Sequence, residues 1–175
     1  MVPYAVKNPK KRQLHKFPGM TVSIYQLRPE SLGSIHIQSP DPSDQPAINF
    51  NFLTDPIDRD AMIAGFKKIR EIMNTKAMRD IRGEEFSPGT EVKTDDEILS
   101  FIRNTAETAY HPIGTCRMGN GPESVVNERL KVHGLEGLRV ADGSIMPTMV
   151  SGNTNAACIM IGEKASEMIK QDNPA

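Results

Sequence analysis

The chain has 175 residues, which suits one cored domain and is short for two. Hydrophobic residues make up 38%, charged residues 25%, and the formal net charge is −1, as in a soluble globular protein. This balance gives no reason to expect nucleic acid or an anionic membrane as partner, and no apolar run is long enough to be a transmembrane segment.

Residues 1–20 contain a basic stretch from Lys7 to Arg12 that Pro9 interrupts. A nucleic-acid-binding arm is one interpretation, but no second basic patch with interleaved aromatic residues accompanies it. We therefore expect a flexible, solvated leader.

Residues 21–52 alternate between apolar and polar side chains, with Pro, Asp, Ser and Gly at the interruptions. Period-two runs separated by turn residues predict three antiparallel strands with one buried face. The apolar positions are Val22 and Ile24, then Ile35 and Ile37, then Ile48, Phe50 and Phe52.

The pattern becomes helical after Asp55 and Pro56, which suit an N-cap and a first helical turn. A capping box at residues 94–97 starts a second amphipathic helix. The last helix, from about Thr154 to Lys170, is apolar almost all round at first, so it is expected to need cover on every side.

His111 is the first candidate for chemistry, because it stands beside Pro112 in a segment rich in glycine. Glycines permit close approach of a ligand, and a histidine is a common general base. The alternative is a loop histidine hydrogen-bonded to backbone.

A second candidate region runs from Asp142-Gly143, after a short apolar strand at residues 138–141, to Asn153 and Asn155 at the start of the last helix. The partial positive charge of a helix N-terminus suits an electron-rich ligand. The alternatives are an ordinary turn at Asp142 and simple helix caps at the asparagines.

Several site classes find no support. The chain has no G-x-S-x-G and no G-x-G-x-x-G, so neither a nucleophile elbow nor a dinucleotide fingerprint is present. Cys116 and Cys158 form no metal-binding spacing, and no metal site is expected. A disulfide between them stays an alternative; a reduced pair and a cytoplasmic protein are favoured.

Residues 111–119, 138–147, 152–155 and 161–165 together resemble the C-terminal signature of the glucose–methanol–choline (GMC) family of FAD-dependent oxidoreductases. The resemblance implies an α+β fold, with an antiparallel sheet and flanking helices in a substrate-binding domain at residues 21–108. Residues 109–175 would hold the active-site loop and the C-terminal strand and helix of the FAD-binding domain.

The resemblance also implies chemistry. His111 would take the hydroxyl proton of a CH–OH group while hydride leaves for the flavin N5, and Asn153 would hydrogen-bond the substrate oxygen. Asp142, Gly143, Asn153, Thr154 and Asn155 match positions that contact FAD. The substrate would be a small alcohol, of the choline or sugar type; dehydrogenase and oxidase are both open.

The family binds the ADP half of FAD through an N-terminal Rossmann-like unit, which this chain lacks. We therefore expect the C-terminal portion of a larger enzyme, partnered by an N-terminal FAD-binding portion and inactive alone. Two alternatives remain open: a non-catalytic binding or assembly module that kept the scaffold, and a complete small α+β ligand-binding protein.

Overall fold

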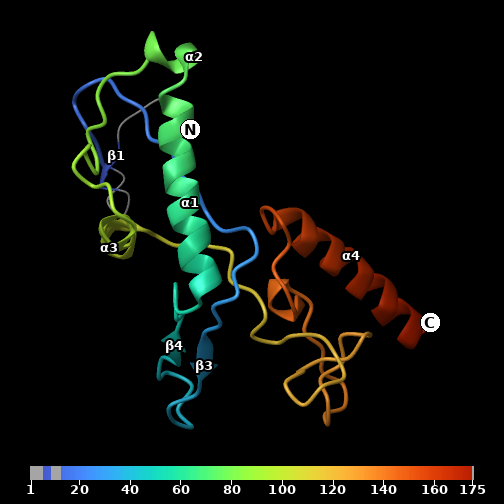
Figure 1. Ribbon diagram of the computed structural model, residues 1–175. Helices are drawn as coiled ribbons and strands as arrows, with labels where there is room; N and C mark the ends of the chain where they lie inside the picture. Colours follow the sequence, from blue (N-terminus) through green and yellow to red (C-terminus); the bar gives the residue numbers. More distant parts are fainter. Residues whose placement is uncertain (1–5, 9–12, 175) are drawn as a thin grey trace. The chain divides into compact units, whose positions relative to one another are not determined.

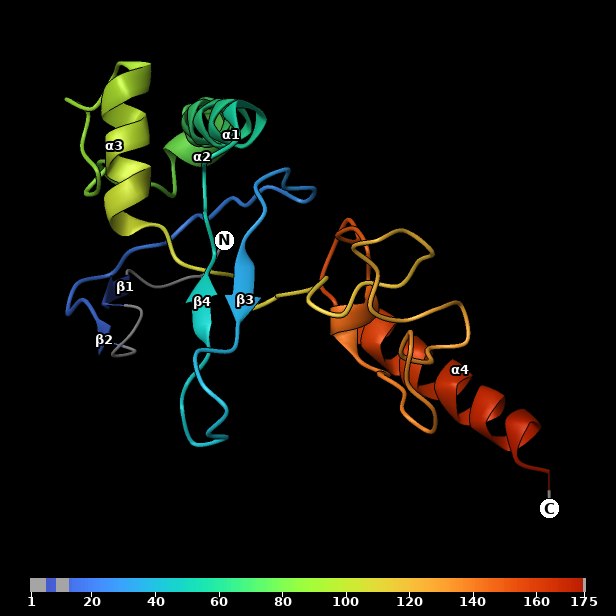
Figure 2. The same cartoon turned by 90° about the horizontal axis from the view of Figure 1, so that it is seen from below.

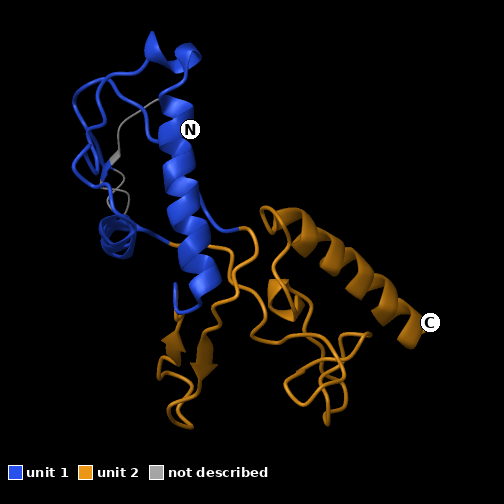
Figure 3. Ribbon diagram, in the orientation of Figure 1, with its two compact units in different colours: residues 1–26, 53–107 blue, residues 27–52, 108–175 orange. Residues whose placement is uncertain are grey.

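The computed structural model describes residues 6–8 and 13–174, and it combines helices with two small antiparallel sheets (Figure 1). The predicted α+β class is confirmed. The chain forms two compact units: unit 1 holds residues 1–26 and 53–107, and unit 2 holds residues 27–52 and 108–175 (Figure 3). Residues 27–52 thus group with the C-terminal third and not with the other residues of the predicted substrate-binding domain at 21–108, whose function stays a prediction.

The described residues of unit 1 form three helices, and local signals fix the starts of the two longer ones. In α1 (Pro56–Met73), Asp55 is the N-cap and accepts a hydrogen bond from the Ile57 backbone N–H, as predicted. The predicted capping box is present at α3 (Asp95–Thr105), between Thr94 and Glu97. The short helix α2 (Lys76–Arg79) was not predicted.

The core of unit 1 lies between α1 and α3, which Figure 2 shows side by side. Ile63, Ile98 and Ile102 are its buried residues. Beside this core, Arg70 stacks on the Phe66 ring and binds the Glu85 carboxylate, which ties the loop after α2 to α1.

The first of the three predicted strands, which contains Val22 and Ile24, is not a strand in the structure. Instead the Ile24 side chain packs on α1 at Gly65, where a Cβ would lie 2.7 Å from its Cδ1. Alternation predicted a strand here, but the residue buries its side chain against a helix. Unit 1 also contains a hairpin of β1 (Val6–Asn8) and β2 (Gln13–Leu14), within the expected leader; residues 9–12 of the basic stretch lie outside the described residues.

The sheet of unit 2 pairs β3 (Ser34–His36) with β4 (Ala47–Asn49), with Ile35 opposite Ile48. The antiparallel pairing was predicted, but the buried face was wrong, because every residue of both strands is exposed. Two strands alone lack the second layer that an apolar sheet face needs.

The remainder of unit 2 is irregular backbone packed against α4 (Asn155–Asp172). The 3-10 helix η1 (Gly143–Ile145) precedes α4, and the predicted strand at residues 138–141 is reduced to a single bridge between Arg139 and Lys131. The buried core residues are Val126, Leu130, Ile145, Met146, Ile161 and Ala165.

Only Ile161 and Ala165 of α4 are buried, while Ile159 and Met160 are 60% and 55% exposed. This chain therefore covers one face of the helix and leaves an apolar face open. Across the described residues, no helix has the length and apolarity that a bilayer-spanning segment needs.

Candidate active site

The histidine segment lies along η1. The backbone N–H of Cys116 donates to the carbonyl oxygen of Ser144 at 3.0 Å, and that of Met118 donates to Ile145 at 2.8 Å. Gly114 begins this run in the left-handed region, with a φ of 82° that favours glycine. Two segments that the sequence singled out separately are therefore neighbours.

The first turn of α4 also packs against η1, at Gly143. A Cβ built on Gly143 would lie 3.2 Å from the Cys158 Sγ and 3.9 Å from the carbonyl oxygen of Pro112. A larger residue at position 143 would push against the helix, so glycine permits this close packing. The histidine segment, the Asp-Gly turn and the start of α4 converge around Gly143.

His111 follows a residue with unusual backbone geometry. Tyr110 has a φ of 60°, although it is not glycine, and its side chain is 75% exposed. Such strain is concentrated at functional sites. The half-buried His111 imidazole makes no hydrogen bond or ion pair with the described residues, so the alternative of a backbone-bonded loop histidine finds no support.

Asp142 acts as the cap of η1, because its Oδ1 accepts a hydrogen bond from the Ser144 backbone N–H at 2.8 Å. Hydrogen bonds from the Ser144 hydroxyl and then from its backbone N–H hold the pKa of Asp142 below its usual value. The carboxylate is therefore ionised at neutral pH. Asp142 thus stabilises a turn, which was the alternative interpretation of the Asp-Gly pair. A contact between Asp142 and a cofactor stays a prediction.

The asparagines do not cap α4. Thr154 is the N-cap residue, and its side chain makes no capping hydrogen bond. Asn153 and Asn155 are exposed on either side of it, and no hydrogen bond joins Asn153 to His111 within the described part of the chain. The first-turn N–H groups and both carboxamides are thus available to a partner.

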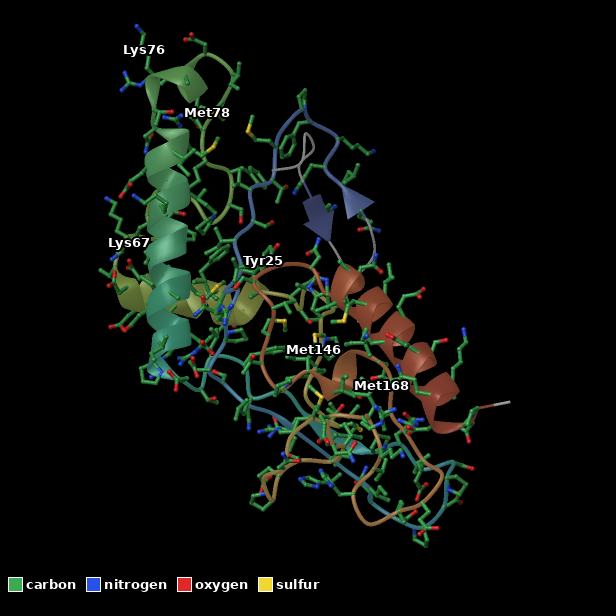
Figure 4. The ribbon with its side chains drawn as sticks, turned by 90° about the vertical axis from the view of Figure 1, so that its right-hand side faces the viewer. Tyr25, Lys67, Lys76, Met78, Met146 and Met168 are labelled. Carbon is green, nitrogen blue, oxygen red and sulfur yellow. The ribbon has the colours of Figure 1, made fainter. Side chains whose placement is uncertain are left out.

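A groove of about 350 Å³ lies in unit 2 between α4 and the irregular backbone. Met146 and Met168, labelled in Figure 4, are among its lining residues, whereas His111 and Asn153 are not. Cys116 and Cys158 are both free thiols and half-buried. Among the described residues, no three His, Cys, Asp or Glu side chains are grouped to hold a metal ion.

The GMC oxidoreductase family model matches residues 29–162. The chain belongs to the GMC oxidoreductase family. The match begins before β3 and ends within α4, so it includes all three segments that converge at Gly143. The resemblance stated from the sequence is confirmed.

Similar curated proteins are several times longer than this chain. The chain is 47% identical over 152 residues to an oxygen-dependent choline dehydrogenase of Escherichia coli O139:H28, covering 87% of this chain and 27% of that protein. It is 50% identical over 151 residues to an alcohol dehydrogenase [acceptor] of Pseudomonas putida, covering 86% and 27%. The chain therefore spans 27% of the length of these relatives.

The chain is also similar to about a quarter of the length of solved oxidoreductase structures. Pyridoxine 4-oxidase from Mesorbium loti has a TM-score of 0.78 and 32% identity, covering 83% of this chain and 28% of that chain. A FAD-dependent oxidoreductase from Chaetomium thermophilum has a TM-score of 0.74 and 35% identity, covering 80% and 24%. Both similarities extend the shared fold over most of this chain.

Two features of the site were missed from the sequence. One is the left-handed conformation of Tyr110, for which a tyrosine gives no local signal. The other is a hydrogen bond from the Arg28 Nε to the Ser151 Oγ, between residues 123 positions apart. Neither side chain stands in a pattern that predicts its partner.

Proposed function

We propose that this chain is the C-terminal portion of a FAD-dependent oxidoreductase that oxidises the CH–OH group of a small alcohol. The convergence of the three family segments around Gly143 is the observation that carries the proposal. A choline-type alcohol is the first substrate to test, because the Escherichia coli relative is a choline dehydrogenase. A sugar alcohol group is the second.

The residues at this place suit a flavin. The start of α4 offers N–H groups that no side chain caps, and Asn155 offers a free carboxamide beside them. Such donors favour an electron-rich ring or a phosphate. In this proposal Thr154, Asn155, Gly143 and Asp142 contact the cofactor, and FAD, when bound, supplies the acceptor for the hydride.

His111 and Asn153 carry the proton chemistry in this proposal. The uncommitted imidazole of His111 takes the proton of the substrate hydroxyl, which leaves an oxygen that is richer in electrons. The Asn153 carboxamide donates a hydrogen bond to that oxygen and stabilises the developing charge. Together they make the carbon a better hydride donor.

The remaining part of the site lies in the N-terminal FAD-binding portion of the enzyme, which this chain needs as its partner. The chain is short of the relatives by almost three quarters of their length, and the apolar residues Ile159 and Met160 of α4 are exposed. Both observations support a chain that is inactive alone. We therefore expect the purified 175 residues to retain no flavin and to be colourless.

The decisive experiment compares variants of the complete flavoprotein by stopped-flow reduction of the flavin with an alcohol. His111→Asn is expected to slow reduction by about 100- to 10,000-fold, and Asn153→Ala by about 100-fold or more. His36→Asn is the control, since His36 is exposed on β3.

Normal reduction by both site variants would instead support a non-catalytic binding or assembly module. A yellow preparation of the isolated 175 residues would support a complete small ligand-binding protein.

A further inference from the structure

The loop at residues 147–153 joins η1 to α4 and carries Asn153, and unit 2 holds it at two points. On its apolar side, Val150 packs against the core of Ile145, Met146 and Ile161. On its polar side, the Ser151 Oγ accepts a hydrogen bond of 2.7 Å from the Arg28 Nε. Within the described part of the chain, this is the one hydrogen bond between the loop and a distant segment.

Arg28 lies in the segment that leads into β3, which starts at Ser34. Further along this segment, the Asn51 Nδ2 donates to the Leu32 carbonyl oxygen at 3.1 Å. At Gly33, a Cβ would come within 2.2 Å of the Asn49 carbonyl oxygen, so the two arms of the hairpin are in direct contact. The guanidinium therefore extends from a segment of unit 2 whose later residues, Leu32 and Gly33, are held against the arm that follows β4.

The geometry around Ser151 transmits this constraint to Asn153. Gly152 separates the two residues, and its backbone N–H donates to the Val150 carbonyl oxygen at 2.8 Å, which closes a tight turn. The Asn153 side chain is exposed and makes no hydrogen bond with the residues that the structure describes, and Thr154 beside it makes no capping bond. Fixing Ser151 thus fixes the chain directly before the carboxamide.

We propose that Arg28 is a positioning residue, which through Ser151 holds Asn153 in place for the substrate oxygen. This inference rests on the proposed role of Asn153. Arg28 contacts neither substrate nor cofactor in this account. Its effect comes from restricting the motion of the loop, and a misplaced group in an active site costs rate even when the fold is intact.

The first test measures hydrogen exchange in the 175-residue chain, where catalysis plays no part. Arg28→Met and Ser151→Ala each remove one partner of the hydrogen bond, and amides 150–156 are expected to exchange about 3- to 10-fold faster. The double variant is expected to match the single ones, because both remove the same bond. Arg103→Met, at an exposed arginine of α3, is the matched control and leaves these amides unchanged.

The second test measures flavin reduction in the complete flavoprotein. Arg28→Met and Ser151→Ala are expected to lower the reduction rate constant by about 10- to 100-fold, with a smaller change in KM for the alcohol. Arg28→Lys keeps a donor and recovers part of the rate, which a purely structural role would not predict. Arg103→Met reduces at the normal rate.

The possible outcomes separate this inference from the proposed function. Unchanged exchange at residues 150–156 overturns the inference, whatever the enzyme does. Faster exchange with normal reduction also overturns it, if Asn153→Ala impairs the same enzyme. Normal reduction by His111→Asn and Asn153→Ala removes the proposed function and this inference together.

Discussion

Two helices of this chain begin in opposite ways. At α3 the Thr94 hydroxyl accepts from the Glu97 backbone N–H at 3.3 Å, and the Glu97 carboxylate accepts from the Lys93 and Thr94 backbone N–H groups at 2.9 Å. At α4 the N-cap residue Thr154 makes no such bond. The first backbone N–H groups of α3 therefore find side-chain acceptors within the chain. Those of α4 have no side-chain acceptor from the N-cap residue.

The capped start of α3 stabilises its own helix, whereas the uncapped start of α4 is suited to the proposed cofactor site. Four N–H groups at the start of any helix need acceptors, so an open start is tolerated where water or a ligand supplies them. Here the open start lies in the segment next to Asn153 and one turn before Cys158, which packs on Gly143. This coincidence supports the proposed flavin contact of Thr154 and Asn155.

The largest expected change in stability concerns the core between α3 and α1. Ile98 of α3 is 1% exposed and packs with Ile63 and Ile102. Ile98→Ala leaves a cavity between α1 and α3, and we expect the free energy of unfolding to fall by about 2–5 kcal/mol in urea titrations of the chain. Ile57→Ala on the exposed face of α1 is the control, with a change of about 0.5 kcal/mol or less. Equal shifts for the two variants would show that α3 is not packed on α1 in this way.

The second prediction compares the two helix starts directly. Thr94→Ala removes half of the capping box and is expected to lower the free energy of unfolding by about 1 kcal/mol. Thr154→Ala removes no capping bond, so the flavin-free chain is expected to keep its stability within about 0.5 kcal/mol. Circular dichroism during urea titration measures both. A loss at Thr154 as large as that at Thr94 contradicts the open start of α4.

The same contrast explains which elements the sequence predicts. Asp55 before Pro56, and Thr94 three residues before Glu97, are local signals, and both helices begin where these residues place them. The bounds of α4 also follow from its own composition. Each of these features depends on hydrogen bonds between residues close in sequence, which a pattern records.

Features that depend on distant partners were predicted less well. The alternation at Val22 and Ile24 indicated a strand, but Ile24 packs on Gly65 of α1, and no local pattern identifies that partner. The strands that contain Ile35 and Ile48 are antiparallel as predicted, yet the layer that would bury these two residues is absent from the described chain. A period of two identifies an apolar face without identifying what covers it.

The site shows the same limit. From local patterns alone, Asp142 had the alternative of a turn, and the structure does place it as a cap of η1. The family resemblance, and not the spacing of the residues, predicts that residues 111–119 and 142–155 form one site, and the hydrogen bond from Cys116 to Ser144 makes the two segments neighbours. The Arg28 contact with Ser151 escaped both approaches.

The far end of α4 differs from its open start. Asp172 is bound there by Lys131 at 2.8 Å, by Arg129 at 2.6 Å and by Arg139, and these cations fix the last turn to residues 129–139. Hydrogen bonds from Lys131, then Arg129 and Arg139, hold the pKa of Asp172 far below its usual range. A helix C-terminus also favours the cations, because its carbonyl groups carry partial negative charge.

The smallest expected effect follows from this ion cluster. Because the pKa of Asp172 is lower in the folded state, its ionised form stabilises the fold above the ordinary aspartate pKa of about 3.9, and the contribution is lost as pH falls through the folded value. Asp172→Asn is therefore expected to lower the urea midpoint at pH 7, and the gap to the unaltered chain is expected to narrow as the pH falls below about 4. Glu167→Gln removes an exposed pair with Lys164 and is the control, with little change at either pH. A gap for Asp172→Asn that stays constant from pH 7 to pH 3 would mean that the carboxylate charge does not hold α4 at this end, and that neither terminus of the helix is fixed by charge within the chain.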